Sequence, residues 1–339
     1  MLVVAACSGD DEAAPDNTPE SLEALKLFDD AVEQTPAQGV TPYDVNAVLY
    51  ADEAEKLRFI SVPEGKTADY DAQGQWSFPD GTRLVKTFFY YLDARSPEQG
   101  RRLLETRIVE RTAGRWTGRT YIWNEAQTEA RRYKVGRTLQ VSWIDKDGES
   151  RMQPYRVPND NECKTCHSKD HQFEPLGPRT RQLNREHDYA DGAANQIDHF
   201  VQRGWLKGVE DRADARYTLA DPYGADSLER RARSYLDANC SHCHRPGGEA
   251  GSTALDLRAE TKEPYSLGNC RSPVAAGPGS GGRRYDIVAG KPDESIMVFR
   301  MLSTDPELKM PELPTLTSDE QGTELIRAWI AAMEPSDCS

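Results

Sequence analysis

Two five-residue segments of this 339-residue chain place two cysteines and a histidine at the same spacing. They read Cys163-Lys-Thr-Cys166-His167 and Cys240-Ser-His-Cys243-His244. Two cysteines one helical turn apart can add their sulfurs to the two vinyl groups of one porphyrin, and the histidine that follows can bind the iron. Chance produces one such pattern in a chain of this composition with a probability of roughly 0.003. We therefore expect two covalently attached c-type haems, held by these six residues.

Two other kinds of site also use paired cysteines. Zinc ribbons place their two cysteine pairs about 15–20 residues apart. Here more than seventy positions separate the pairs, and each pair carries an additional histidine. A dithiol redox motif requires neither a second pair nor a histidine. These observations favour haem attachment, and zinc binding and dithiol chemistry are the less favoured alternatives.

Each haem iron needs a second axial ligand, or it stays open for chemistry. For the second motif we expect the thioether of Met310 to be this ligand, because a Met-Pro pair just before a C-terminal helix resembles the place of the distal thioether in class I cytochromes c. A thioether ligand raises the reduction potential of a haem. Met297 and Met301 are spaced by four residues in another predicted helix, and we expect them to form a wall of the same pocket.

The second ligand of the first haem is harder to identify. His171 follows His167 by only four residues, so on one helix it would lie on the same side of the haem. Met152 precedes the motif, and His187 and His199 follow it. We favour His199 because it lies in a segment with a helical pattern. A surface histidine is the alternative for each of these residues.

The remaining three cysteines suit an exported protein, since c-type haem is attached outside the cytoplasm in bacteria. We expect a disulfide between Cys270 and Cys338, with two unrelated thiols as the alternative. Val4-Ala5-Ala6-Cys7 is typical of the end of a lipoprotein signal peptide, which would make Cys7 the lipidated residue. The alternative is an incidental cysteine. Because the six residues before Cys7 are too short for an apolar signal core, we expect the recorded start to be truncated.

The charge balance restricts the classes of partner. Lys and Arg number 42 and Asp and Glu number 56, which gives a formal net charge of −14. Nucleic-acid binding needs clustered Lys and Arg, so this class is excluded. The chain also contains no apolar run long enough to cross a bilayer, so we expect membrane contact only through a lipid anchor at Cys7.

Residue patterns divide the chain into four expected segments. Residues 1–40 hold the signal remnant, an acidic tether and a short helix starting near Thr18-Pro19. Residues 41–157 form a β-rich domain, a small antiparallel sandwich or barrel, because apolar and polar residues alternate there, as at 138–143. Residues 158–212 form the first haem-binding segment. Residues 213–339 form a second haem domain that resembles a cytochrome c. The expected fold class is therefore α+β multidomain, an antiparallel β domain followed by a mainly α cytochrome c-like haem region.

Two helices frame the second motif in this interpretation. Leu228, Ala232, Tyr235 and Leu236 recur at helical spacing, so a helix is expected to lead directly into Cys240. Near the C-terminus, Thr317-Ser-Asp-Glu320 is a candidate capping box. The helix that it starts would turn the following apolar side chains inward: Leu325, Ile326, Trp329, Ile330 and Met333. Two such helices packed together resemble the frame of a class I cytochrome c.

The motifs together resemble a largely uncharacterised family of secreted bacterial diheme c-type cytochromes, over about residues 40–335. The segments that carry the resemblance are Pro42-Tyr-Asp-Val-Asn46, Trp76-Ser-Phe-Pro-Asp-Gly-Thr82, Val85-Lys-Thr-Phe88, Tyr121-Ile-Trp-Asn124, both Cys-x-x-Cys-His motifs, Leu176-Gly177, Gln182-Leu-Asn184, Arg231-Ala-Arg-Ser-Tyr235, Arg300-Met301 and Met310-Pro311. The resemblance implies two covalent haems and a location in the periplasm or at the outer membrane surface. It implies no substrate. Glu312 stands where a second proline is common in the family.

We expect a protein that passes electrons between two haems and on to a redox partner in the periplasm or at the outer membrane. Its acidic charge would favour a basic patch on that partner. The alternative is an enzyme of the diheme peroxidase type, in which one haem has an open or displaceable distal face. The unclear second ligand of the first haem motivates this alternative.

Overall fold

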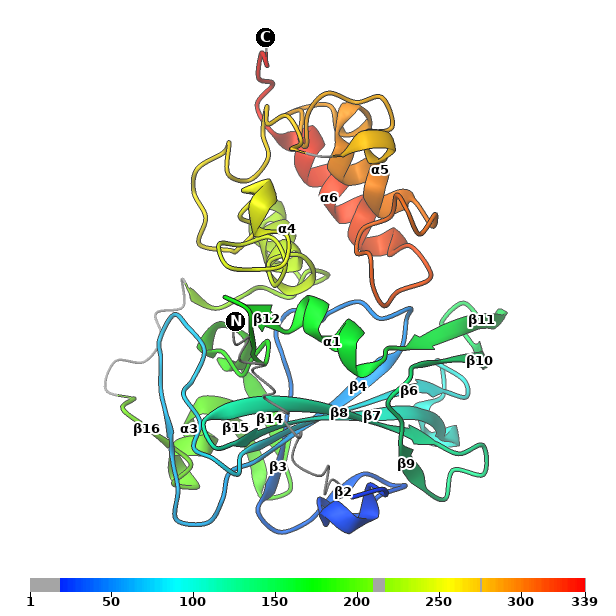
Figure 1. Cartoon of the computed structure of the whole chain (residues 1–339), viewed down its shortest axis with the longest axis vertical. Coiled ribbons are helices and arrows are strands. Elements are labelled where there is room, and N and C mark those ends of the chain that lie inside the picture. The colour runs from blue at the N-terminus through cyan, green and yellow to red at the C-terminus, as the bar shows by residue number, and fades with distance from the viewer. Residues whose placement is uncertain (1–18, 210–216, 275, 339) are drawn as a thin grey trace, which may run out of the picture.

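A six-stranded antiparallel sheet forms the lower half of the molecule in Figure 1. The computed structural model describes residues 19–209, 217–274 and 276–338. The strand order in the sheet is β3-β4-β6-β7-β8-β9. The strands are β3 (Val40–Tyr43), β4 (Glu55–Ser61), β6 (Arg83–Tyr91), β7 (Arg101–Thr112), β8 (Arg115–Trp123) and β9 (Ala130–Arg132). Neighbours in this order follow one another along the sheet without a crossover, as expected for short antiparallel connections.

The sheet buries side chains on both of its faces. On β6, Val85 and Phe89 pack with the N-terminal segment, which contains η1 (Glu23–Leu25), β1 (Phe28–Asp30) and β2 (Thr35–Pro36). Phe88 and Tyr90 point to the opposite face and pack against the hairpin of β10 (Arg137–Ile144) and β11 (Ser150–Val157). Alternation of this kind places successive residues of a strand on opposite faces. The strand expected at 138–143 is confirmed, but the region is one open sheet with an added hairpin instead of a sandwich or barrel.

Short elements follow the hairpin and cover one end of the sheet. They are α1 (Asp160–Cys166), β12 (Ser168–Lys169), β13 (Gln172–Phe173), α2 (Thr180–Leu183), β14 (Glu186–Tyr189), β15 (Gly192–Asn195), α3 (Gln196–Gln202) and β16 (Leu206–Lys207), which pairs in parallel with β5 (Ala68–Asp69). Leu183, Ile197 and Phe200 pack on Trp76 and on Ile60 of the sheet. These elements therefore share an apolar core with the β-sheet.

Three helices form the upper part of the molecule in Figure 1: α4 (Leu228–Asn239), α5 (Ile296–Leu302) and α6 (Glu320–Ala332). Their apolar faces form one cluster, in which Ala232 and Leu236 of α4 contact Ile326 and Trp329 of α6. The remaining chain of this part is turns and the short 3₁₀ helices η4 (Gly251–Thr253), η5 (Gly277–Ser280) and η6 (Pro292–Glu294). A further 3₁₀ turn, η2 (Pro97–Gln99), precedes β7.

The prediction of a mainly α, cytochrome c-like haem region is wrong. Among the described residues after 157, only α4 and α6 are longer than seven residues, and five short strands lie between α1 and α4. No α-helix occurs between the ends of α4 and the start of α5 among the described residues. This stretch holds Gly247-Gly248, Gly268 and Gly277 at backbone conformations or close approaches that interrupt helices. The whole chain is therefore dominated by its antiparallel sheet.

Two details at helix ends also differ from expectation. The segment after Pro19 forms only a 3₁₀ turn, and Phe28 lies in β1 instead of on a helix. Thr317 does not cap the C-terminal helix, because α6 begins at Glu320 and the carboxylate of Asp319 accepts the Gly322 amide at 2.8 Å. The Thr317 hydroxyl donates instead to Asp52 at 2.7 Å. The contact with Asp52, which is distant in sequence, therefore takes the Thr317 hydroxyl that the local sequence predicts as the cap of α6.

Buried polar groups join the sheet to the helical part. Asp52, before β4, accepts hydrogen bonds from the amides of Leu316 and Thr317, each at 2.9 Å. The side chain of Asn239, at the end of α4, accepts from the Tyr50 amide at 2.7 Å and donates to the Val48 carbonyl at 3.1 Å. Buried polar groups that are satisfied only across a boundary fix how two parts dock.

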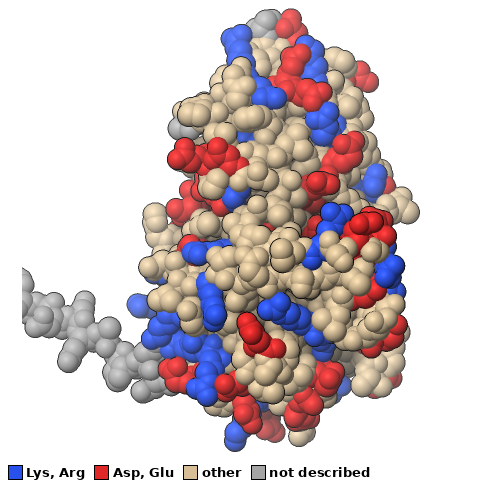
Figure 2. Space-filling model, turned by 90° about the vertical axis from the view of Figure 1, so that its right-hand side faces the viewer, with Lys and Arg blue, Asp and Glu red and all other residues tan. Residues whose placement is uncertain are grey.

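Positive and negative side chains are interspersed across the face shown in Figure 2. Within the part of the chain that the structure describes, no helix combines the length and the apolar composition required to cross a membrane.

Candidate functional site

The first cysteine pair lies on α1, a helix whose start is strongly determined by the sequence. Asn159 caps it by accepting the amide of Glu162 at 2.8 Å, and the Glu162 carboxylate accepts the Asn159 amide at 2.8 Å. This reciprocal pair is a capping box. Cys163 and Cys166 are spaced by three residues on α1, so their side chains lie on the same side of the helix. The expected spacing of one helical turn is therefore present.

Cys163, Cys166 and His167 line a cavity of about 220 Å³. The cavity lies between α1 and the sheet, and Asp237 of α4 and His242 in the turn after it line another side. Much of its wall is apolar, with side chains such as Leu84, Phe88, Val109, Phe173 and Leu183. A concave, mainly apolar site with a few convergent polar groups is typical of cofactor binding.

His167 is held in an orientation that leaves one ring nitrogen available. Its Nδ1 lies 2.9 Å from the carbonyl oxygen of Glu174, and its ring stacks on Phe173 with centroids 5.1 Å apart. A carbonyl can only accept, so Nδ1 carries the proton and Nε2 keeps its lone pair. Burial lowers the pKa of His167 to about 4. The neutral imidazole is the form that binds a metal.

A glycine of the sheet makes room for this arrangement. A Cβ atom at Gly118 of β8 would lie 2.9 Å from Cζ of Phe173. Any larger residue would push Phe173 away, and with it the ring that stacks on His167. The position of His167 therefore depends on a small residue in β8.

The second cysteine pair lies in the turn that follows α4. Cys240 is the C-cap of α4, and the Cys240 carbonyl accepts the amide of His244 at 3.0 Å. Nδ1 of His244 lies 3.3 Å from the hydroxyl oxygen of Thr253, which itself donates to the Ala250 carbonyl. That hydroxyl therefore accepts from Nδ1, and Nε2 of His244 is again free. Burial lowers the pKa of His244 to about 4.

The structure brings the two motifs into contact. The Cys243 thiol donates to the carbonyl of Thr165, 78 positions earlier in the chain, at 3.5 Å. The potential ligand atoms of Cys166, His242 and Cys243 all lie within 4.8 Å of one another. Hydrogen bonds from Cys243 and His242 lower the pKa of the Cys166 thiol. The amide of Asp170 also donates to the Gly247 carbonyl at 2.9 Å. The two attachment segments are thus neighbours in space.

This contact bears on the zinc alternative, which was disfavoured by the distance between the pairs along the chain. Cys166, His242 and Cys243 supply three possible ligands, whereas a structural zinc site is built from four. No fourth His, Cys, Asp or Glu joins this group among the described residues. Cys163, Cys240, His167 and His244 have no place in such a site. The haem interpretation uses these four residues as well as Cys166 and Cys243.

Burial raises the pKa of Cys163 to about 11 and that of Cys240 to about 12. These two thiols are therefore protonated and poorly reactive at neutral pH. Neither has the lowered pKa that a dithiol redox motif needs in its attacking cysteine, whereas the pKa of Cys166 is lowered.

Met310 lies next to α5. Its amide donates to the carbonyl of Arg300 at 3.0 Å. The positive charge of Arg300 is close enough to His244 to contribute to the lowered pKa of that histidine. Met297 and Met301 belong to the apolar cluster between α4 and α6, which also includes Cys240.

The structure does not bring His199 to the first motif. His199 lies on α3, is buried, and stacks on the ring of Tyr189 with centroids 3.5 Å apart. It is not among the residues that line the cavity of Cys163 and His167. His187, also considered as a ligand, packs edge-on against Tyr189. Met152 is exposed.

Cys270 and Cys338 form a disulfide with an S–S distance of 2.02 Å and a Cα–Cα distance of 5.0 Å. It ties the end of the chain to the turn after Gly268, within the helical part of the molecule. Cys7, the candidate lipidation site, and the acidic segment up to residue 18 lie outside the described residues.

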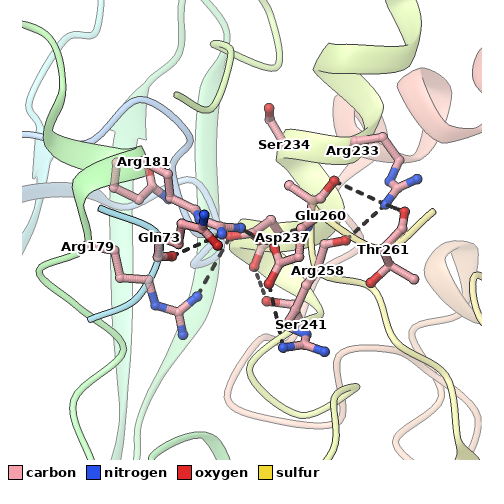
Figure 3. A network of polar contacts seen from close by, with 12 residues as sticks. Gln73, Arg179, Arg181, Arg233, Ser234, Asp237, Ser241, Arg258, Glu260 and Thr261 are labelled. Atoms are coloured by element: carbon pink, nitrogen blue, oxygen red, sulfur yellow. Dashed lines mark hydrogen bonds and ion pairs between the residues drawn. The ribbon is translucent and has the colours of Figure 1, made fainter. Parts of the chain in front are cut away.

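A buried ion network stands beside the cavity and joins α2 to α4 (Figure 3). The Arg181 guanidinium lies 3.0 Å from the carboxylate of Asp237, is also paired with Glu260, and donates to the Gln73 carbonyl at 3.1 Å. Arg181 is 4% exposed, so its charge is compensated almost entirely by protein groups. Since Asp237 lies three residues before Cys240, this network holds the segment that leads into the second motif against α2.

Sequence reasoning missed a row of cations in the cavity wall. Arg58, Lys86 and Arg107 lie directly opposite one another on β4, β6 and β7, and all three line the cavity. A signal was present in the sequence: Lys86 has the same parity as Leu84, Phe88 and Tyr90, so alternation places it on a buried face. A lysine at an inward position calls for a partner.

Comparison with protein-family models, with curated proteins and with solved structures found no match for this chain.

Proposed function

We propose that the chain is a diheme c-type cytochrome that transfers electrons. One haem would be held by Cys163, Cys166 and His167, and the other by Cys240, Cys243 and His244. The contact between the two motifs is the observation that carries this proposal. Two sites that exchange electrons must be close together, and Cys166 and Cys243 lie within 4.8 Å of each other in one group.

The described residues of the two motifs are suited to holding haem. Cys163, Cys166 and His167 open onto one mainly apolar cavity. Each motif histidine has its Nδ1 engaged by an oxygen acceptor, at 2.9 Å for His167 and 3.3 Å for His244. Such a hydrogen bond fixes the ring orientation and makes Nε2 a better ligand. Haem bound at these positions supplies a one-electron couple at iron.

The protein's own residues would set the properties of each site. Glu174, through its carbonyl, orients His167, and Thr253 orients His244. Met310 is the proposed second ligand of the second haem, and a thioether there raises the reduction potential. The apolar wall around His167 excludes water, which also tunes the potential.

The location and partner are part of the same proposal. We infer a protein exported to the periplasm or the outer membrane surface and anchored by a lipid at Cys7, as the resembling secreted cytochromes imply. The redox partner would dock through a basic patch, given the formal net charge of −14.

The test is expression with haem-maturation machinery, followed by mass measurement and visible spectroscopy. Two covalent haems and two one-electron steps in a reductive titration are expected. Met310→Ala should lower one potential and convert one haem toward high spin. His199→Ala is the control, because the structure places His199 outside the cavity. Colourless protein after correct export would contradict the proposal.

A second candidate function is a peroxidase-type enzyme that uses the first haem. The observation that favours it is the composition of the cavity wall, which includes no methionine and only one histidine besides His167, namely His242. A haem without a strong second ligand stays open to hydrogen peroxide. Turnover with peroxide and a high-spin signal from one haem in the resting protein would support this function. Two low-spin haems and no turnover would remove it.

A further inference from the structure

The cation row in the cavity wall, formed by Arg58, Lys86 and Arg107, has an unusual charge balance. Cross-strand pairing sets Arg58 opposite Lys86, and Lys86 opposite Arg107. Like charges directly opposite on neighbouring strands destabilise a sheet. The row must therefore be offset by negative groups.

The two arginines at the ends of the row have protein partners. Arg58 lies 3.0 Å from the carboxylate of Asp44. Arg107 is held by both carboxylate oxygens of Glu105, which is fully buried and also accepts the hydroxyl of Tyr155 at 2.7 Å. Each arginine is thus paired with one acid.

Lys86, in the middle of the row, forms no ion pair and no side-chain hydrogen bond among the described residues, although the charge of Glu105 partly offsets its surroundings. The Nζ atom of Lys86 lies 5.0 Å from the centroid of the Phe88 ring. Burial, together with the charges of Arg58 and Arg107, lowers its pKa well below the usual range. An anion placed against this amine would favour its charged form, so the position is suited to binding an anion.

The position of the row selects the chemistry of that anion. Lys86 and Arg107 line the same cavity as Cys163, Cys166 and His167, and their charges act on the imidazole of His167. A c-type haem carries two propionates on the side of the ring away from its thioether links. Arginine and lysine bind carboxylates through charge-assisted hydrogen bonds.

We propose that Arg58, Lys86 and Arg107 form a carboxylate-binding row that holds the propionates of the haem attached at Cys163 and Cys166. This inference rests on the proposed function and adds to it the residues that orient the first haem. A carboxylate from solution could offer the same chemistry, and the experiment separates the two sources.

The experiment compares Lys86→Met with the wild-type holoprotein. Lys66→Met is the matched control, because it removes one positive charge from an exposed position. We expect Lys86→Met to keep two covalent haems by mass and to lower the midpoint potential of one haem only. Its propionate bending bands in the resonance Raman spectrum should shift. Lys86→Arg should restore both properties, and Lys66→Met should change neither.

Three results would overturn the inference while leaving the proposed function in place: two haems with unchanged potentials and Raman bands in Lys86→Met, equal shifts of both potentials, or equal effects of the Lys66 control. An acetate-dependent Soret shift in the wild type that is lost in Lys86→Met would assign the row to a dissolved carboxylate and overturn the propionate assignment. Protein without covalent haem would instead contradict the proposed function.

Discussion

The same five-residue motif occurs in two different settings in this molecule. The first lies on α1 against a β-sheet, beside a cavity with cations in its wall. The second lies in the turn after α4, next to an apolar cluster of three helices. Only the local features agree: the cysteine spacing and the hydrogen bond that engages Nδ1 of each histidine. The motif therefore requires a helical turn and an acceptor, and the surrounding scaffold is free to differ.

The largest expected effect comes from removing one cysteine pair at a time. Cys163→Ala with Cys166→Ala should remove one haem, and Cys240→Ala with Cys243→Ala should remove the other, because each pair supplies its own thioether links. The intact mass and the reduced visible spectrum would each report half of the wild-type haem. The two half-loaded proteins should differ in spin state and potential, since their scaffolds differ. Identical spectra would contradict the expectation that the two scaffolds give their haems different properties.

A smaller effect is expected where the two regions are joined. Arg181→Leu removes the closer of the two arginines that face the buried carboxylate of Asp237, the other being Arg179 at 4.0 Å, and breaking a buried pair costs about 3–5 kcal/mol. The free energy of unfolding, from denaturant titration, should fall by this amount. Arg327→Leu, which removes an exposed pair with Asp293, is the control and should cause little change. Equal losses in both variants would show that the network does not join the regions.

The disulfide should act on one region only. Replacing both Cys270 and Cys338 by serine opens a link between residues 68 positions apart, and a loss of about 2–4 kcal/mol is typical. Because both cysteines lie in the helical part, amide hydrogen exchange should accelerate in α4–α6 and stay unchanged in β4–β8. Uniform acceleration across both regions would mean that they unfold as one unit.

The smallest effect concerns pH. Burial raises the pKa of Asp286 to about 6, whereas the carboxyl has its usual lower value in the unfolded chain. Between about pH 4 and pH 6 the unfolded chain therefore loses this proton first, and the folded state loses stability as the pH rises. Asp286→Asn should be more stable than the wild type above pH 6, by about 1–2 kcal/mol after discounting for solvent screening.

This difference should vanish below about pH 4, where the carboxyl is protonated in both states. Thermal unfolding at several pH values measures it. Glu334→Gln, at an exposed position, should show no such pH-dependent gain. A gain for Asp286→Asn that persists at low pH would argue for a packing effect instead of a charge effect.

The strands could be predicted from the sequence because each carries a strong local pattern. The alternation at 138–143 is the same in the sequence and in β10. Apolar residues at helical spacing likewise placed α4 and α6. The predicted cap of α6 was wrong because the Thr317 hydroxyl donates to Asp52, a residue 265 positions away. Local patterns do not contain such contacts.

The site was predicted only in part for the same reason. Spacing identified the two motifs, but their contact through Cys166 and Cys243 depends on how α1 and α4 dock. His199 was chosen for its helical pattern, and the structure places it against Tyr189. Lys86 was overlooked because its importance comes from Arg58 and Arg107, which neighbour it only once the sheet has formed.

The nearness of Cys166 and Cys243 also constrains biogenesis. In an oxidising compartment, two thiols held this close could couple to each other, and neither sulfur would then be available for a vinyl group. Both are already partly enclosed between α1 and the turn after α4 in the folded chain. On the proposed function, the maturation enzymes must therefore reach a reduced chain before its two halves close.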